Sequence, residues 1–325
     1  MRRTRALGTA SLQVTELGFG AASIGGLYAA VSRETAMSAL QAAWDEGLRY
    51  FDTAPFYGFG LSARRIGDFQ RDNSGHVLST KVAKMLRAVP KGQVSDHGFV
   101  DPLPFTVDFD YPCDAIMRSY ELSLARLGLN RIDILYVHDL EPRGLGASHD
   151  AHFARFMDSG LKALEQLKSQ GAIAAYRLGV NEVAAVLNVI DRARLHCLLL
   201  AGRFTLLDRT GAAEVMPKCL AAGTGVVVVG VFNSGILATG AVPGAHFDCG
   251  RASADVIARV NAMEAEAKRQ GATLPAAALR FVLDHPAVAS VLVGAAKASS
   301  VIRNVALLRD APALNWPPFN ALALT

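Results

Sequence analysis

The sequence predicts an α/β protein, a (β/α)8 TIM barrel with a short N-terminal β-hairpin, on three observations. Segments typical of strands and helices alternate along the whole chain, with eight strand segments that are each followed by a helix. The strand segments are continuous apolar runs, as in a parallel sheet covered by helices on both faces. The 325 residues show no linker or break in composition, and this length suits one barrel. We therefore expect a single domain over residues 1–325, with an open doubly wound sheet as the alternative.

The expected elements follow one another in a regular order. A hairpin is expected over residues 4–17, and the barrel strands at 17–20, 48–52, 76–81, 132–138, 172–180, 196–202, 225–232 and 288–294. Helices are expected at 32–44, 62–69, 113–129, 159–169, 182–192, 212–222, 254–270, 275–285 and 299–308. Ser32 is a typical N-cap for the first helix, whereas Asp114 is expected to cap the third and Gly128 to end it.

Residues 84–112 interrupt this order. They contain four prolines and four aspartates and show no clear period. We expect a long inserted loop here, and loops of this length usually serve a function or move.

Composition and charge exclude several classes of protein. The net charge of +4 is spread without a basic block, which argues against nucleic-acid binding. The N-terminus lacks the apolar core of a signal peptide. The uncharged stretch Leu220 to Ala245 is long enough to cross a bilayer, but glycines, Asn233 and Pro243 interrupt it. We expect a buried strand and a Gly-rich loop there, and hence a soluble protein with no membrane partner.

The cysteines point to a cytoplasmic location. They are far apart and form no CxxC motif, which is typical of thiols in a reducing compartment rather than of disulfides or a zinc site. The four are Cys113, Cys197, Cys219 and Cys249.

Polar side chains stand at the ends of four predicted strands, namely Asp52, Lys81, His138 and Asn181, and Tyr57 follows Asp52 in the same loop. In a barrel these strand ends meet at one mouth, where chemistry takes place. Each residue alone has an ordinary structural explanation, since an Asp after a strand is most often a turn or helix cap. Their coincidence indicates one site.

These residue types suit proton transfer. A tyrosine titrates near pH ~10, and a nearby lysine ammonium lowers that pKa by favouring the phenolate. A buried lysine needs a carboxylate partner, which Asp52 can supply. A histidine can orient a substrate oxygen by a hydrogen bond. Such a set needs no metal and no covalent nucleophile, and its natural partner reaction is hydride transfer with a nicotinamide cofactor.

The motifs around these residues resemble the aldo-keto reductase family over nearly the whole chain. "FDTAPFYGFG" (51–60) resembles its Asp-Thr-Ala-x-x-Tyr-Gly signature, and "STK" (79–81) and "IDILYVHD" (132–139) resemble its lysine and histidine strands. The resemblance implies that Asp52, Tyr57, Lys81 and His138 form a catalytic tetrad. In the oxidising direction, Tyr57 would take the proton of the substrate hydroxyl.

The resemblance also implies a cofactor site. In "LGVNE", Asn181 would bind the nicotinamide carboxamide, and Phe232 would stack on the nicotinamide ring. The pyrophosphate and adenosine contacts would come from Asn233, Ser234, Gly235, Leu237, Gly294, Ala295, Ser300 and Asn304. Many family members hold the 2′-phosphate of NADP with cations where this chain has none, and a phosphate dianion needs such partners. NAD is therefore favoured, and Lys297 and Arg303 keep NADP as the alternative.

Further segments indicate a branch of the family. "LAGRFTLLD" (200–208) and "GVFNSGIL" (230–237) resemble the NAD(P)-dependent sugar 1-dehydrogenases. These include L-fucose and D-threo-aldose 1-dehydrogenase, which oxidise a cyclic sugar at C1 to a lactone. The alternative is pyridoxal 4-dehydrogenase, which makes 4-pyridoxolactone from another cyclic hemiacetal. Tyr176 and Arg177 depart from the sugar enzymes.

Aromatic residues of the inserted segment are the substrate candidates. Phe105, Phe109 and Tyr111 would stack on a pyridine ring or cover the apolar face of a sugar. Packing within the loop is the other interpretation of all three.

Other functions are weaker alternatives. An NADPH-dependent aldehyde or ketone reductase and a non-catalytic binding subunit remain open. "GFGAASIGG" (18–26) lacks the third glycine of a Rossmann motif, and "HDAH" (149–152), which we expect in a loop, has no further metal-ligand cluster. We expect no metal, a small-molecule substrate, and a monomer or small homo-oligomer.

Overall fold

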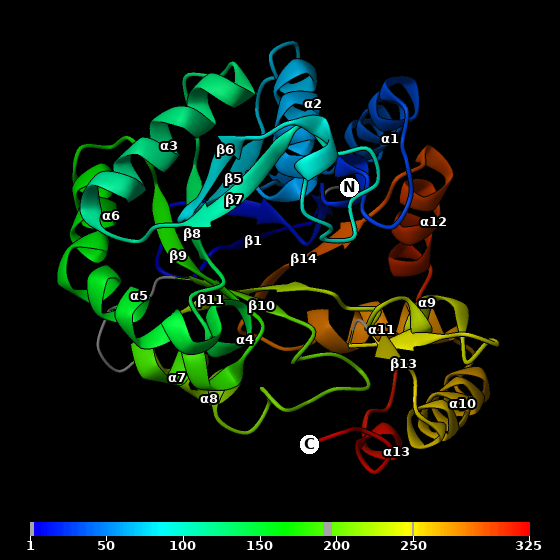
Figure 1. Ribbon diagram of the computed structural model, residues 1–325. Coiled ribbons are helices and arrows are strands. Elements are labelled where there is room, and N and C mark those ends of the chain that lie inside the picture. Colours follow the sequence, from blue (N-terminus) through cyan, green and yellow to red (C-terminus); the bar gives the residue numbers. More distant parts are fainter. Residues whose placement is uncertain (1–2, 191–196, 249) are drawn as a thin grey trace.

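The computed structural model confirms the barrel. Within residues 3–190, 197–248 and 250–325, which are the residues that the structure describes, eight parallel strands close on themselves (Figure 1). They neighbour one another in chain order, and the last pairs with the first. The strands are β3 (Leu17–Gly20), β4 (Tyr50–Asp52), β5 (Val77–Val82), β8 (Ile134–His138), β9 (Ala175–Val180), β10 (Cys197–Ala201), β11 (Gly225–Val229) and β14 (Val288–Gly294).

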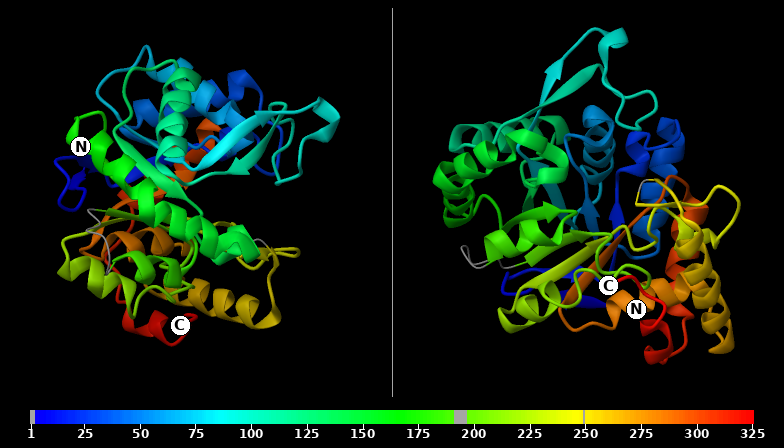
Figure 2. Two further views of the ribbon diagram at one scale, coloured as in Figure 1. Left: turned by 60° about the vertical axis from the view of Figure 1, so that its left-hand side comes forward. Right: turned by 60° about the horizontal axis from the view of Figure 1, so that its bottom comes forward.

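Helices surround the strands in the order that the sequence predicts (Figures 1 and 2). They are α1 (Arg33–Asp45), α2 (Leu61–Gln70), α3 (Cys113–Leu127), α6 (Leu161–Ser169), α7 (Val183–Ile190), α8 (Val215–Ala221), α10 (Ala254–Arg269), α11 (Leu274–Leu283) and α12 (Ala298–Arg309). Ser32 caps α1 by accepting a hydrogen bond from the Thr35 N–H at 3.1 Å. Gly128 ends α3 with a φ of 65°. The expected cap by Asp114 is wrong, because Pro112 is the N-cap residue and Asp114 lies in the first turn.

The N-terminal hairpin closes one end of the barrel. Strand β1 (Thr4–Ala6) pairs with β2 (Gln13–Thr15), and Leu7 and Val14 pack into the barrel interior with Tyr50 and Tyr136. The two tyrosine hydroxyls lie 3.0 Å apart. With this end filled, a substrate has access only from the opposite end, where the strands have their carboxyl ends.

The sequence predicted that segment 84–112 is a loop without regular structure. This prediction is wrong, because part of the segment forms two paired strands. Strands β6 (Lys84–Ala88) and β7 (Phe105–Phe109) form an antiparallel ribbon that projects from the barrel (Figure 2). Lys84 pairs with Phe109 at the base of the ribbon, and Ala88 pairs with Phe105 further out. The ribbon thus places one end of each strand beside the mouth.

Short elements fill the remaining connections. They are η1 (Ser23–Gly25), η2 (Tyr57–Gly60), η3 (Lys91–Gln93), α4 (Pro142–Leu145), η4 (Gly146–Ser148), α5 (His149–Arg155), the π-helical η5 (Phe156–Gly160), α9 (Ile236–Thr239), β12 (His246–Phe247), β13 (Gly250–Arg251) and α13 (Pro317–Asn320). The motif "HDAH" therefore begins a helix, and the expectation of a loop there is wrong. Among the described residues, none of the helices has the length and apolar character needed to cross a membrane.

Close packing of α2 on α3 gives a stability test. A Cβ at Gly67 would overlap the Leu127 carbonyl oxygen, so Gly67→Ala must push the two helices apart. We expect a loss of about 1–3 kcal/mol in the free energy of unfolding, which is typical of overpacking. Chemical denaturation followed by circular dichroism measures it.

The matched control is Gly92→Ala at the ribbon tip, where no described atom lies within 4 Å of the added Cβ. This control should change stability by less than about 0.5 kcal/mol. Equal stabilities of the two variants would contradict the packing described here.

Candidate active site

The structure brings the four predicted tetrad residues to one place, the open mouth of the barrel. Asp52 and His138 are the last residues of β4 and β8, and Lys81 lies near the end of β5. Tyr57 begins η2, directly after β4. Asp52, Lys81 and His138 are buried, whereas Tyr57 keeps part of its surface in contact with solvent.

A buried ion pair joins two of the four. Lys81 Nζ lies 2.6 Å from Asp52 Oδ2 and also donates to the Thr53 carbonyl at 3.1 Å. Ser79 Oγ donates to the other oxygen of Asp52 at 2.7 Å. Burial lowers the pKa of Lys81, but the charges of Asp52 and Tyr57 raise it more, and the net pKa lies above its usual value. Lys81 is therefore a fixed ammonium ion.

Tyr57 faces this ammonium ion. Lys81 Nζ lies 4.6 Å from the centroid of the Tyr57 ring. Burial raises the pKa of Tyr57, the charge of Lys81 lowers it and that of Asp52 raises it again. The net pKa of Tyr57 lies above its usual value, so the lysine acts in the expected direction but burial outweighs its effect.

His138 is a neutral imidazole at ordinary pH. Its ring stands edge-on to Tyr57, with centroids 6.1 Å apart. Burial holds the pKa of His138 well below its usual range, and Lys84 and Lys81 lower it further against the opposing charge of Asp139. His138 Nδ1 is buried and has no hydrogen-bond partner among the described residues, so the ring can still bond a bound molecule.

A second lysine lies at the mouth, and the sequence analysis missed it. Lys84 is 4% exposed and forms an ion pair with Asp139. Asp139 has a φ of 49°, in the left-handed region, and lies 3.7 Å from His138 Nε2. Burial works to raise the pKa of Asp139, whereas its interactions with the His138 ring and with the charge and hydrogen bond of Lys84 bring that pKa to about 2. The sequence offered one indication of this ion pair. Asp139 directly follows His138 at the end of a buried strand, where a carboxylate needs a cation as its partner.

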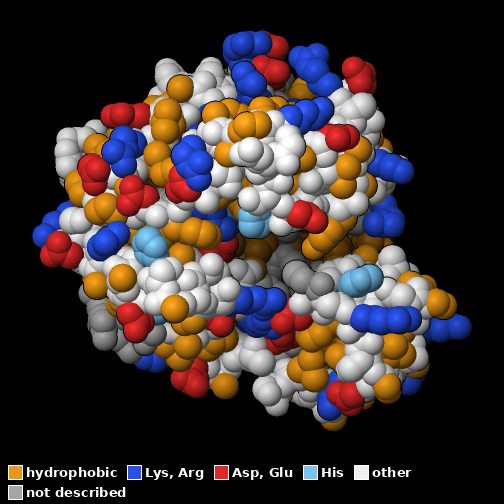
Figure 3. Space-filling model, viewed as in Figure 1, with side chains coloured by type: hydrophobic (Ala, Val, Ile, Leu, Met, Phe, Trp, Pro, Cys, Tyr) orange, Lys and Arg blue, Asp and Glu red, His pale blue; other side chains and the backbone are white. Residues whose placement is uncertain are grey.

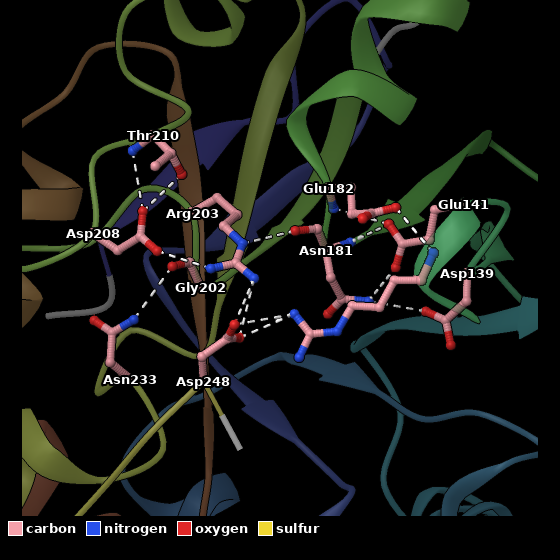
Figure 4. A network of polar contacts seen from close by, with 11 residues as sticks. Asp139, Glu141, Asn181, Glu182, Gly202, Arg203, Asp208, Thr210, Asn233 and Asp248 are labelled. Carbon is pink, nitrogen blue, oxygen red and sulfur yellow. Dashed lines mark hydrogen bonds and ion pairs between the residues drawn. The ribbon is translucent and has the colours of Figure 1, made fainter. Parts of the chain in front are cut away.

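Asn181 is held by acids in a defined orientation (Figure 4). Its Nδ2 donates to Glu141 Oε1 at 2.6 Å and to Asp139 Oδ1 at 3.2 Å, and its backbone N–H donates to Glu141 Oε2 at 2.7 Å. Both side-chain donors are thus used, whereas no donor to the amide oxygen is found among the described residues. This arrangement fits a carboxamide N–H donor of the kind that nicotinamide carries.

Arginines extend the network across the mouth (Figure 4). Arg203 donates to the Asn181 carbonyl at 2.9 Å and to Asp208 at 2.9 Å. Asp248, between β12 and β13, accepts from Arg203 at 3.0 Å and from Arg143 at 3.1 Å. Figure 3 shows a hollow in the middle of this face with charged side chains along its rim.

The predicted pyrophosphate segment follows β11. Phe232 is half-buried, Ser234 is exposed and Gly235 has a φ of 98°. Asn233 is buried, accepts from Thr205 Oγ1 at 2.6 Å and donates to the Gly202 carbonyl at 3.3 Å. Leu237 is fully buried. Asn233 and Leu237 thus hold the turn from within, while Phe232, Ser234 and Gly235 keep surface available for a ligand.

The predicted adenosine residues lie at the end of β14 and on α12. Gly294 ends β14, and a Cβ there would meet Ser23 Oγ at 2.9 Å. Ala295 is buried and Ser300 is half-buried. Asn304 is buried, and its Oδ1 has no partner among the described residues. A buried acceptor of this kind fits the amino group of an adenine, so the residues present fit a nicotinamide dinucleotide.

The predicted substrate aromatics lie at different depths. Phe109 lies beside Lys84, whose Nζ is 5.3 Å from its ring centroid. Phe105 lies further out along the ribbon. Tyr111 is fully buried and donates to the His138 carbonyl at 2.9 Å, which places it beneath the mouth as a packing residue. Tyr176 is buried as well, and the side chain of Arg177 lies outside the described part of the chain.

Other rings, which the sequence did not single out, line the mouth. Phe56 lies 5.9 Å from His138 and 5.5 Å from Phe99, between ring centroids. Phe99 also lies 6.4 Å from Tyr57. We call Phe56, Tyr57 and Phe99 the aromatic wall. Phe99 belongs to the inserted segment, and a β-bridge with Leu27 brings it back to the barrel.

Known proteins support the assignment that this geometry indicates. The chain is 41% identical over 313 residues to pyridoxal 4-dehydrogenase of Microbacterium luteolum, covering 93% of this chain and 91% of that protein. It is 36% identical over 306 residues to D-threo-aldose 1-dehydrogenase of Pseudomonas sp, covering 92% and 91%. The holo form of aldo-keto reductase AKR11C1 from Bacillus halodurans has the same fold, with a TM-score of 0.77 at 24% identity over 100% of this chain and 97% of that chain.

The family model covers almost the whole barrel. The model of the aldo/keto reductase family matches residues 16–312, from the start of the first barrel strand to the end of the last barrel helix. The matched residues include all four tetrad positions and the expected cofactor contacts. The chain is therefore an oxidoreductase that belongs to the aldo/keto reductase family.

Proposed function

We propose that the protein is an NAD-dependent dehydrogenase that oxidises a cyclic hemiacetal to a lactone. The observation that carries the proposal is the buried Lys81–Asp52 pair beside Tyr57, next to a neutral His138. Aldoses and pyridoxal, the compounds in the names of the two relatives, both cyclise to hemiacetals. In such a ring the reacting carbon carries a hydroxyl group, whose proton Tyr57 can take, and a hydrogen, which can leave as a hydride to the nicotinamide.

Each residue has a defined part in this reaction. A bound nicotinamide would accept the hydride from the hemiacetal carbon. Tyr57 takes the hydroxyl proton, and the Lys81 ammonium stabilises the negative charge on the phenol oxygen during the transfer. Asp52 and Ser79 hold Lys81 in place. His138 orients the substrate oxygen through a neutral imidazole.

The aromatic wall supports pyridoxal over a sugar as the substrate. A flat heteroaromatic ring can lie face-on against one of the two perpendicular rings, Phe56 or Phe99, and edge-on to the other, whereas a sugar offers only a few C–H groups. The higher identity to the pyridoxal enzyme agrees with this preference. A D-threo-aldose is the second candidate, because the other relative carries that name.

Two finer assignments belong to the proposal. NAD is favoured over NADP because Gly294, Ala295 and Ser300 offer no cation for a 2′-phosphate, although Lys297 and Arg303 are exposed nearby. A cytoplasmic location is favoured because Cys113, Cys197 and Cys219 form no disulfide in the part of the chain that the structure describes, outside which Cys249 lies.

Absorbance at 340 nm tests the function directly. Pyridoxal, L-fucose and D-arabinose are each supplied with NAD and with NADP. We expect turnover of pyridoxal with NAD at a kcat/KM at least tenfold above the sugars, a difference of about 1.4 kcal/mol. Turnover of the sugars alone would reverse the order of the two candidates. No turnover of any hemiacetal with either cofactor would contradict the proposal.

Removing one hydroxyl group tests the role of Tyr57. Tyr57→Phe should lower kcat by more than about 10²-fold, since general acid–base groups contribute on that scale, while NAD binding measured by fluorescence stays nearly unchanged. The matched control is Tyr120→Phe, whose hydroxyl donates to the Ala172 carbonyl on the outer layer. Full activity of Tyr57→Phe would refute the mechanism.

The pKa shifts predict the shape of the pH profile. Because the pKa of His138 is lowered, this imidazole stays neutral down to acid pH, and kcat/KM should show no step near pH ~6.5. Because the pKa of Tyr57 is raised, the oxidation rate should keep rising through the alkaline range. The measurement uses a sugar substrate, which does not titrate there. His138→Gln should be slower but keep the alkaline rise, and a wild-type step near pH ~6.5 would argue against a neutral histidine.

A further inference from the structure

Lys84 is a buried cation at the mouth that the tetrad mechanism does not use. It is the first residue of the ribbon and is 4% exposed. Its one hydrogen-bond acceptor among the described residues is Asp139. An ammonium group carries three N–H donors, so two remain without an acceptor.

Aromatic rings occupy the other sides of this ammonium group. Lys84 Nζ lies 4.0 Å from the ring centroid of Phe56 and 5.3 Å from that of Phe109. Such cation–π contacts are weaker than a charge-assisted hydrogen bond to an anionic oxygen. An oxygen anion on a flat ring placed between these phenylalanines would therefore be a better partner for Lys84.

The two carboxylate oxygens of Asp139 bind different partners, and only one of them binds Lys84. Its Oδ2 accepts from Lys84, while its Oδ1 accepts from the Asn181 amide at 3.2 Å. These two hydrogen bonds hold the carboxylate between Lys84 and Asn181. Lys84 is thus held in position while keeping capacity for a further acceptor.

The position of Lys84 relative to the reacting centre defines where such an acceptor must lie. Phe56 contacts both Lys84 and His138, with its ring 5.9 Å from the histidine ring. Lys84 is also close enough to His138 to lower its pKa. A substituent that reaches Lys84 would therefore lie on the side of the substrate ring that faces Phe56, close to the reacting carbon.

We propose that Lys84, with Phe56 and Phe109, forms a subsite for an ionised hydroxyl on an aromatic ring, ortho to the hemiacetal carbon. This subsite rests on the proposed function and narrows it to hydroxyaryl hemiacetals, of which pyridoxal is one. The hydroxyl on such a ring is acidic enough to ionise beside an ammonium group. Sugar hydroxyls are not, and they gain little from a buried cation.

Two matched substrates test the subsite. The first is 2-hydroxy-6-(hydroxymethyl)benzaldehyde, and the second, 2-(hydroxymethyl)benzaldehyde, lacks only the phenolic hydroxyl. Both cyclise to five-membered hemiacetals and yield lactones. The readout is the ratio of their kcat/KM values with NAD. We expect the wild-type enzyme to favour the hydroxylated compound at least tenfold, and Lys84→Met to lose that preference.

Control variants separate recognition from folding. Lys91→Met removes an exposed lysine from the same inserted segment and should keep the wild-type ratio. Lys84→Arg keeps the charge and should keep most of the preference. Should Lys84→Met fail to fold because Asp139 loses its partner, the double variant Lys84→Met/Asp139→Asn removes both charges and should also lose the preference.

Each outcome has one meaning. A ratio in Lys84→Met equal to that of the wild type, even with both rates lowered, would show that Lys84 only supports the structure and would overturn the subsite. A wild-type enzyme that oxidises sugars but does not favour the hydroxylated compound would overturn the subsite and leave hemiacetal oxidation standing. If no hemiacetal of any kind is oxidised, the proposed function and the subsite both fail.

Discussion

The ion pair between Lys81 and Asp52 is the interaction on which the rest of the site depends. Its atoms lie 2.6 Å apart in a buried position. Two buried charges are tolerated only when their geometry is good and their other donors and acceptors are satisfied. Ser79 and the Thr53 carbonyl meet that condition here. The pair therefore keeps a positive charge beside Tyr57 that water cannot screen.

The packed barrel holds this buried ion pair in a fixed geometry. Its interior is packed by side chains from the strands, and the N-terminal hairpin fills the far end with Leu7 and Val14. Asp52 and Lys81 come from neighbouring strands, β4 and β5, whose register is set by parallel pairing. Because the scaffold is rigid, the Asp52 and Lys81 side chains are already ordered before the substrate binds, and no conformational entropy is lost in ordering them during a turnover. The mouth is then left to loops and to the ribbon, which determine what binds.

Much of this could be predicted from the sequence. Most of the strands are apolar runs, and Asp52 and His138 each follow such a run directly, whereas Lys81 follows Ser79 and Thr80 in the "STK" motif. Local sequence carries this information because these polar residues lie at or next to the last residue of their strands. The family motifs around Tyr57 add to it, and the structure brings all four together.

The parts that could not be predicted depend on pairing between distant residues. The ribbon depends on pairing between residues that are far apart in sequence, such as Lys84 and Phe109. The prolines and aspartates of the segment obscure the alternation of polar and apolar residues that would otherwise predict two strands. Tyr111 was predicted as a substrate contact or a packing residue of the loop, and its hydroxyl is buried against the His138 carbonyl. The net pKa of Tyr57 depends on how deeply the ring is buried, which no local pattern gives.

The charge of Lys81 acting on Tyr57 is the central claim, and it can be measured without a substrate. The protein is labelled with ¹³C at the tyrosine Cζ, the Tyr57 signal is assigned by its loss in Tyr57→Phe, and its chemical shift is followed against pH. We expect Tyr57 to ionise at a lower pH in the wild type than in Lys81→Met, because the ammonium favours the phenolate. An unchanged pKa for Tyr57 in Lys81→Met would contradict the account.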